Sequence, residues 1–271
     1  MKQTLQLAVS EPVSIGIGGM AIALHTRDLG FRQLLEDRYA GFIQSGSRAQ
    51  FEFDIDIFEP GETEHAEDDV QVRQQRGEWL LQRGDFQARW DARGHGHIRQ
   101  TRNPYAVDSV LRIVHTLILA RQGGFLVHAA SAIRGGHAFL FAGASGAGKT
   151  TISRLAPPDA ALLTDEISYV RRAGNAYEAW GTPFAGELAK VGENQAAPLS
   201  ALFLLEKGPE NRIEELAEAD AIRLLLRNIL FFAEDPELVS LVFRSACEFV
   251  EKVPVRRLVF VPDQSVWEIV R

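Results

Sequence analysis

The sequence FLFAGASGAGKTT, Phe139 to Thr151, is the strongest indication of the fold in the second half of this chain. Its apolar start predicts a strand, the glycine-rich run predicts a loop, and the residues that follow Gly148 predict a helix. The loop fits the pattern G-x-x-x-x-G-K-[ST] from Gly143 to Thr150, which in this setting is typical of proteins that bind nucleotide phosphates. A glycine-rich turn without a ligand is the alternative.

The residue types of the loop fit that chemistry. Glycines adopt positive φ at little cost, so successive backbone N–H groups can point into one concavity and meet phosphate oxygens. Lys149 supplies a mobile cation for the outer phosphates, and the Thr150 hydroxyl is placed to ligate Mg²⁺. We therefore expect ATP and Mg²⁺ as cofactors, with the nucleotide held by Gly143, Ala144, Ser145, Gly146, Ala147, Gly148, Lys149, Thr150 and Thr151.

Composition narrows the class of protein. The 271 residues, of which 46% are hydrophobic, can bury one large core or two modest ones. The net charge is −7 with both signs interspersed, which predicts no nucleic-acid partner. The single Cys247 favours a reducing, cytoplasmic location. No signal peptide is visible, and the most apolar segment, residues 224–233, is too short to span a membrane.

Residues 1–104 predict a smaller α+β module that precedes the nucleotide-binding part and has a possible role in substrate recruitment. Apolar spacing predicts a helix over Leu29 to Tyr39, and alternation over Phe51 to Phe58 predicts a half-buried strand. Three further strands are expected as a meander, over residues 78–82, 86–90 and 97–99.

Polar segments of this module have competing interpretations. The acidic residues 61–69 predict a loop. The carboxylates Glu52, Asp54 and Asp56 share the wet face of their predicted strand, and a metal pair there is the functional alternative. His95 and His97 are expected as turn residues, with a metal site as the alternative.

Residues 105–271 predict an α/β domain with a mixed sheet. A helix over Val107 to Arg121 is followed by an apolar strand over Phe125 to Ile133, a tight turn, and the strand that enters the phosphate loop. These two strands predict an antiparallel hairpin. Further elements are a short helix stopped by Pro157-Pro158, strands at 160–164, 167–171, 176–180, 201–206, 257–261 and 266–270, and helices at 219–233 and 236–253.

Two carboxylates follow the next predicted strand after the loop. Asp165-Glu166 are separated from Lys149 by one short helix and one strand, so the chain returns directly beside the loop. One carboxylate can hold the metal and the other can accept a proton from an attacking hydroxyl. A surface pair in a turn is the alternative.

Three segments in this order resemble the C-terminal catalytic domain of HPr kinase, which shares a fold superfamily with ATP-dependent phosphoenolpyruvate carboxykinase. The segments are Val127-His128-Ala129-Ala130, the loop from Gly143 to Thr150, and Leu163-Thr164-Asp165-Glu166. The resemblance covers about residues 105–271. More specifically, the chain resembles the short HPr-kinase-related proteins of bacteria. It implies a phosphoenolpyruvate-carboxykinase-like P-loop kinase fold and a possible homo-oligomer.

The resemblance also implies residue roles. Asp165 would be the general base, assisted by His128 near the phosphates and by Lys149 on them. Mg²⁺ would be held by Thr150, by Glu166 as the second carboxylate and, on a looser match, by Glu187. Asn211 and Arg212 could reach nucleotide or substrate, or serve as surface residues.

The sequence thus predicts a serine kinase that moves the γ-phosphate of ATP to a serine or threonine hydroxyl in a peptide or small protein. HPr itself is not the expected substrate, because the segment that follows the catalytic core in HPr kinase has no counterpart here. A nucleotide-binding interaction protein with little transfer activity, and a kinase acting on a small molecule such as free serine, are the alternatives.

Overall fold

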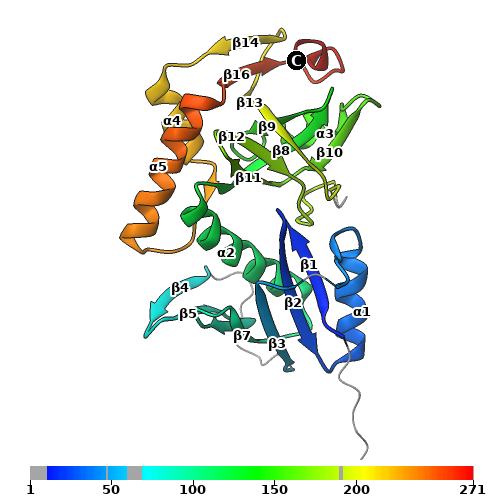
Figure 1. Ribbon diagram of the computed structural model, residues 1–271. Coiled ribbons are helices and arrows are strands. Elements are labelled where there is room, and N and C mark those ends of the chain that lie inside the picture. Colours follow the sequence, from blue (N-terminus) through cyan, green and yellow to red (C-terminus); the bar gives the residue numbers. More distant parts are fainter. Residues whose placement is uncertain (1–10, 47, 60–68, 189–191, 271) are drawn as a thin grey trace, which may run out of the picture. The chain divides into compact units, whose positions relative to one another are not determined.

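The computed structural model describes residues 11–46, 48–59, 69–188 and 192–270. The chain divides into two compact units, Met1–Val107 and Asp108–Arg271, and each is described here by itself (Figure 1). The division falls inside helix α2 (Pro104–Gln122), which begins at the predicted module boundary. The protein is an α/β protein with mixed sheets, as the sequence predicts.

In its described residues, the first unit is a seven-stranded sheet with one complete α-helix and a short 3₁₀ helix, Ala40–Phe42. Its strands are β1 (Val13–Ile17), β2 (Met20–Thr26), β3 (Phe51–Ile57), β4 (Gln71–Gln75), β5 (Glu78–Arg83), β6 (Phe86–Trp90) and β7 (His95–Gln100). They lie in the order β1-β2-β3-β7-β6-β5-β4, with β3 parallel to both of its neighbours. The predicted meander and the predicted strand at β3 are therefore confirmed, but the expectation that His95 and His97 are turn residues is wrong, because both lie in β7.

Helix α1 (Leu29–Arg38) confirms the predicted helix in this unit. It begins where the Asp28 side chain accepts a hydrogen bond from the Phe31 backbone N–H at 2.9 Å, which satisfies one of the free donors of the first turn. Phe31 and Leu35, one turn apart, are its buried residues. The acidic segment predicted as a loop, residues 61–69, lies outside the described residues except for Asp69.

The second unit is built on a nine-stranded mixed sheet. Its strands are β8 (Phe125–Arg134), β9 (His137–Ala142), β10 (Ala160–Thr164), β11 (Ile167–Ala173), β12 (Ala176–Trp180), β13 (Ala196–Lys207), β14 (Arg212–Glu215), β15 (Ile229–Leu230) and β16 (Val255–Phe260). The predicted β8–β9 hairpin is confirmed as antiparallel, whereas β13 runs parallel to both β9 and β16.

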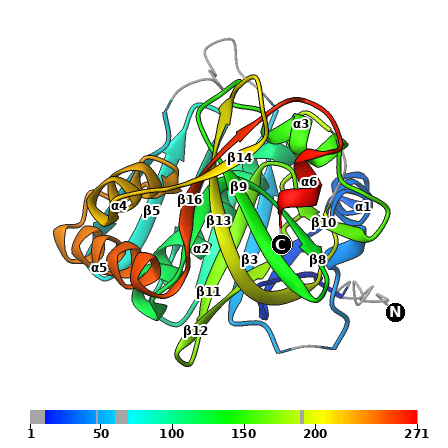
Figure 2. The same ribbon diagram turned by 90° about the horizontal axis from the view of Figure 1, so that it is seen from above.

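The two long strands β8 and β13 each pair with different partner strands along their length (Figure 2). In β8, Phe125 to His128 pair with β11, and Ala129 to Arg134 pair with β9. In β13, the first residues pair with β12 and the later ones with β9 and β16. The strand that feeds the phosphate loop is consequently held on both sides, between β8 and β13.

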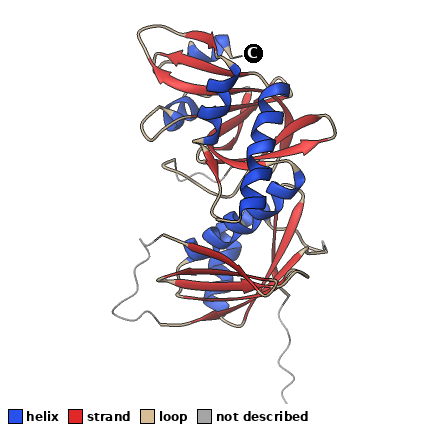
Figure 3. Cartoon of the chain, turned by 90° about the vertical axis from the view of Figure 1, so that its left-hand side faces the viewer, coloured by secondary structure: helices blue, strands red, loops and turns tan. Residues whose placement is uncertain are grey.

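Alternation along β9 buries both of its faces. Ala138, Leu140 and Ala142 join a core that includes Leu225 of α4 (Glu218–Leu226) and Phe249 of α5 (Pro236–Lys252). Phe139 and Phe141 join a second core with Ile152 of α3 (Lys149–Arg154) and Trp267 of α6 (Val266–Ile269). The blue helices of this unit and its red strands are seen in Figure 3. Burial on both faces explains the uninterrupted apolar run.

Two predicted elements of this unit are wrong. The helix expected over residues 219–233 ends at Leu226, and Ile229–Leu230 form strand β15 instead, paired with β8. The closing strand expected over 266–270 is the short helix α6. Trp267 explains this difference, because its indole N–H donates to the Ile152 carbonyl at 3.2 Å and its ring packs edge-on against Phe141. No helix in the described part of the chain is long and apolar enough to cross a membrane.

Candidate functional site

The topology brings the three sequence segments of interest to one edge of the sheet. Strands β9 and β10 flank β8 on opposite sides and both run antiparallel to it, so their carboxyl ends lie at the same edge. The registers place Ala142 opposite Ala129, and Ile167 opposite His128. The phosphate loop, His128 and Asp165-Glu166 therefore follow one another across three strands, with neighbouring strands about 4.8 Å apart.

The loop has the backbone that its glycines permit. Gly146 and Gly148 have positive φ values of 78° and 114°. A side chain at Gly148 would also lie 2.5 Å from Cζ of Phe260, so this position requires glycine for space as well as for conformation. Ala144 and Ser145 are exposed at the rim, while Gly143 is buried at the end of β9. The loop is open to solvent above a closely packed base.

Lys149 is the buried cation of the site. Only 7% of its surface is exposed, and its ammonium donates to the carbonyls of Gly143 at 2.8 Å and Ala144 at 3.4 Å. Burial lowers the pKa of Lys149, and the carboxylates of Glu166 and Glu187 act in the opposite direction. The side chain thus lies inside the loop, within the electrostatic reach of two acids that come from other segments.

Thr150 meets one of those acids directly. Its hydroxyl donates to Oε2 of Glu187 at 3.1 Å, and Glu187 is exposed. Thr151, the next residue in α3, is half-buried. Glu187, whose match to the HPr kinase pattern is the weakest among the predicted site residues, is therefore in contact with the Thr150 hydroxyl, which the sequence predicts as a Mg²⁺ ligand.

His128 lies between the loop and the carboxylates. Its Nδ1 is 3.4 Å from Oε1 of Glu166, and its backbone N–H donates to the Asn228 carbonyl at 2.7 Å. Burial lowers the pKa of His128, Lys149 lowers it further, and Glu166 partly offsets both. The imidazole is accordingly held neutral near pH 7.

Asp165 differs sharply from its neighbour Glu166. It is 1% exposed, with Oδ1 accepting from the Gly186 N–H and Oδ2 from the Leu188 N–H, both at 2.9 Å. These bonds attach the segment that carries Glu187 to the end of β10. A side chain at Gly186 would lie 2.6 Å from Oε2 of Glu166, so glycine permits this close approach.

Comparison with protein families now assigns the chain. The family model for SynChlorMet cassette protein ScmC matches residues 100–270, which include every residue of the site described above. The chain belongs to the SynChlorMet cassette protein ScmC family. A search of curated proteins found no match.

The family assignment corrects the resemblance to HPr kinase and its relatives. The quoted segments contain the features that a phosphate and Mg²⁺ site calls for: a glycine loop with lysine and hydroxyl, and a pair of carboxylates. These local requirements are met by many proteins, and only the match over residues 100–270 assigns this member of the ScmC family. The roles that the resemblance implied for single residues stay predictions.

One residue near the site is absent from the sequence predictions. Arg112 of α2 lies with its guanidinium carbon 4.8 Å from the ring centre of Phe184, in the segment that leads to Glu187. Its positive charge also contributes to the lowered pKa of His128. The signal in the sequence is a charged residue between Leu111 and Ile113, on a helix that is otherwise apolar along this stretch.

The structure does not bring the other predicted polar residues to this site. Asn211 bonds to Ser265 and to the Val261 N–H, and Arg212 pairs with Glu210 and Glu214. Within the described ranges, no group of three or more His, Cys, Asp or Glu side chains could hold a metal ion.

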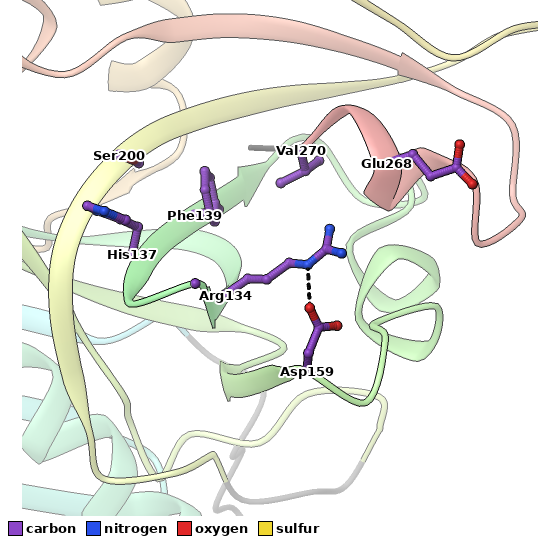
Figure 4. A pocket seen from close by; sticks show the side chains of 8 residues that line it. Arg134, His137, Phe139, Asp159, Ser200, Glu268 and Val270 are labelled. Atoms are coloured by element: carbon purple, nitrogen blue, oxygen red, sulfur yellow. Dashed lines mark hydrogen bonds and ion pairs between the residues drawn. The ribbon is translucent and has the colours of Figure 1, made fainter.

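A hollow of about 580 Å³ lies at the other end of the β8–β9 hairpin (Figure 4). It is lined by Arg134, Gly135, His137, Phe139, Asp159, Ser200, Glu268 and Val270. Arg134 is engaged there, since its Nε donates to Oδ2 of Asp159 at 3.0 Å and its Nη1 donates to the Trp267 carbonyl. This cation joins β8 to β10 and α6.

Proposed function

We propose that residues 108–271 form a P-loop kinase domain that transfers the γ-phosphate of ATP to a serine or threonine hydroxyl of a peptide or small protein. One observation carries the proposal: Lys149 and Thr150 of the loop have two carboxylates near them, Glu166 and Glu187, from two other segments of the chain. A loop that only turned the chain would have no need of this arrangement.

The hydrogen bonds of Lys149 indicate how the loop would bind a nucleotide. Its ammonium has backbone carbonyls as partners, and it can exchange them for phosphate oxygens, which form stronger, charge-assisted bonds. The exposed residues of the loop then place their backbone N–H groups around the phosphates. The bound phosphates would offset the cost of keeping the cation buried.

The oxygen donors of the site fit Mg²⁺. Thr150 and Glu187 would hold it, and two protein ligands suffice because Mg²⁺ keeps several waters and takes phosphate oxygens in such sites. When bound with ATP, the ion would neutralise charge on the phosphates.

Proton transfer has two candidate carboxylates. The base role predicted for Asp165 stays a prediction, and Glu166 is the second candidate. We favour Glu166, because it is half-buried rather than fully buried and contacts neutral His128, whereas both oxygens of Asp165 already accept backbone hydrogen bonds. In the step, the acceptor oxygen bonds to the γ-phosphorus, the bond to ADP breaks, and the hydroxyl proton passes to Glu166.

The word cassette in the family name is compatible with a peptide or small protein from the same cassette as the acceptor. Positioning and charge neutralisation would supply most of the rate gain, since phosphoryl transfer needs little covalent work from the protein.

The deciding experiment follows the label from γ-labelled ATP. The full chain is incubated with candidate peptides and, in a parallel reaction, with free serine, and we expect label on serine or threonine of a peptide. Glu166→Gln should reduce this transfer about 10²- to 10⁴-fold while ATP binding, measured by calorimetry, is kept. Glu237→Gln, which replaces an exposed acid in the first turn of α5, is the matched control. Label found only in free phosphate, or on free serine, would replace the proposal with one of the two alternatives.

A further inference from the structure

One face of the sheet in the first unit is open, and its charges are sorted by strand. On β3, Phe53 and Ile55 are buried while Glu52, Asp54 and Asp56 are exposed. On the neighbouring strands β4 to β7, buried apolar residues alternate with residues that are mostly cations and glutamines, and Glu78 at the start of β5 is the exposed acid among them. We call the cationic part the arginine face; it consists of Arg73, Arg89, His97 and Arg99.

The strand registers align these side chains in rows. Arg73 is opposite Leu80, Leu80 is opposite Arg89, and Arg89 is opposite His97. The next row holds Gln71, Gln82, Gln87 and Arg99 in the same way. Neighbours within a row are about 5 Å apart, so the cations lie close enough to engage one extended ligand. Together these residues line a groove of about 350 Å³.

The three arginines keep their charge available. Arg73 donates to the neutral Gln71 side chain at 3.1 Å, and the guanidinium of Arg99 lies over the Phe58 ring at 5.0 Å. His97 is the exception, with Nε2 at 2.9 Å from Oδ2 of Asp56. In the described part of the chain none of the three arginines forms an ion pair with a carboxylate.

We propose that the arginine face binds an acidic segment of a peptide or small protein, laid across β4 to β7. The cations match aspartate and glutamate side chains, the glutamine amides can both donate to and accept from a peptide backbone, and Leu80 offers an apolar contact between two arginines. This binding does not require the proposed nucleotide site to function. Only its use in recruiting the phosphate acceptor rests on the proposed function.

Nucleic acid fits this surface less well. Its backbone is uniformly negative, and the row of Glu52, Asp54 and Asp56 lies directly beside the cations. A short acidic peptide can occupy the arginine face and avoid those carboxylates, whereas a longer polyanion would meet them.

The test is fluorescence anisotropy of a short, labelled, glutamate-rich peptide with the full chain and no nucleotide. The variant Arg73→Gln/Arg89→Gln/Arg99→Gln should weaken binding about tenfold, since three exposed charge pairs are removed. The control Arg27→Gln/Arg76→Gln/Arg93→Gln removes equal charge from exposed positions outside the groove and should leave binding unchanged. Melting curves establish that both variants fold.

A reciprocal variant sharpens the test. Glu52→Gln/Asp54→Asn/Asp56→Asn removes the neighbouring carboxylates and should tighten binding of the acidic peptide. Equal weakening by both arginine variants would overturn the proposal, because net charge alone would then explain the binding. Tighter binding of a single-stranded oligonucleotide than of the peptide would also overturn it. Failure of phosphate transfer in the labelling experiment would leave this binding result unaffected.

Discussion

The two ends of the β8–β9 hairpin each hold a cation, and the two cations are held in different ways. At the turn, Arg134 forms an ion pair with Asp159 at 3.0 Å and donates to the Trp267 carbonyl. At the loop end, Lys149 is buried and donates to two backbone carbonyls. The first charge is paired with a carboxylate and joins neighbouring elements, while the hydrogen bonds of the second go to neutral backbone carbonyls.

The partners of a cation indicate whether it could bind an added anion. An ion pair that is complete within the protein has little to gain from an added anion. A buried ammonium whose pKa is lowered by burial gains from any phosphate that reaches it. The carboxylates near Lys149 act over a distance rather than as close partners, and Glu187 contacts Thr150 instead.

The largest expected effect comes from removing each cation in turn. Lys149→Ala should weaken ATP binding about ten- to a hundredfold, because charge-assisted bonds to phosphate are lost, and should abolish transfer. Arg134→Ala should leave ATP affinity unchanged and lower the free energy of unfolding by about 1 kcal/mol. Calorimetry with ATP and urea unfolding measure the two effects. Equal loss of ATP affinity in both variants would erase the distinction between the two ends.

The sequence predicts much of the fold around this hairpin, for physical reasons that are local. Apolar runs mark β8 and β9, Pro157-Pro158 stop α3, and the glycines mark the loop. What it misses depends on distant partners. Residues 229–230 continue an apolar stretch that resembles the end of a helix, and only their pairing with β8 makes them a strand. The indole bond of Trp267 to Ile152 is equally invisible in the local pattern around α6.

The candidate site shows the same limit. Motif spacing alone brings together Lys149, Thr150 and the Asp165-Glu166 pair in the prediction. It does not show that Asp165 is fully buried and bonded to two backbone N–H groups, because those come from Gly186 and Leu188, distant in the chain. Nor does it indicate Arg112, whose closeness to Phe184 depends on how α2 packs.

The next effect separates the two adjacent carboxylates at the loop end. Glu166→Gln should reduce phosphate transfer about 10²- to 10⁴-fold with little change in stability. Asp165→Asn should instead lower the free energy of unfolding by about 1–3 kcal/mol, because the amide keeps one acceptor oxygen but places an NH₂ donor against the other of the two backbone N–H groups. Transfer rates and urea unfolding of both variants provide the comparison. A stable Asp165→Asn protein that has lost transfer would return the base role to Asp165.

Glycines at the two ends give a smaller contrast. Gly148 and Gly135 both have positive φ, but a side chain at Gly148 would meet the Phe260 ring, whereas none of the described atoms lies within 4 Å of one at Gly135. Gly135→Ala should cost about 1 kcal/mol of stability for the backbone conformation alone. Gly148→Ala should cost about 3 kcal/mol and also weaken ATP binding, since the ring or the loop must move. Similar melting temperatures for the two variants would show that the Phe260 ring can move aside at little cost in free energy.

The smallest expected effect is on the pH dependence of stability: His128 at the loop end and Asp159 at the turn should affect the free energy of unfolding in different pH ranges. The pKa of His128 is held below its ordinary value of 6.5, so the unfolded chain binds this proton more tightly and acidification below pH 6.5 destabilises the fold. The pKa of Asp159 is lowered from 3.8, chiefly by its bond to Arg134, so the stability it contributes is lost only as the pH falls below 3.8.

Unfolding of the native chain, His128→Gln and Asp159→Asn by urea across this pH range tests the two windows. The stability of the native chain relative to His128→Gln should fall as the pH drops below 6.5. Buried His115, whose pKa is lowered to about 3, titrates in the same range but is common to both proteins, so its contribution cancels. Relative to Asp159→Asn, the native chain should hold its advantage until pH 3.8. A single shared window would mean that the two ends of the hairpin do not titrate independently, and that the difference between their cations is not electrostatic in origin.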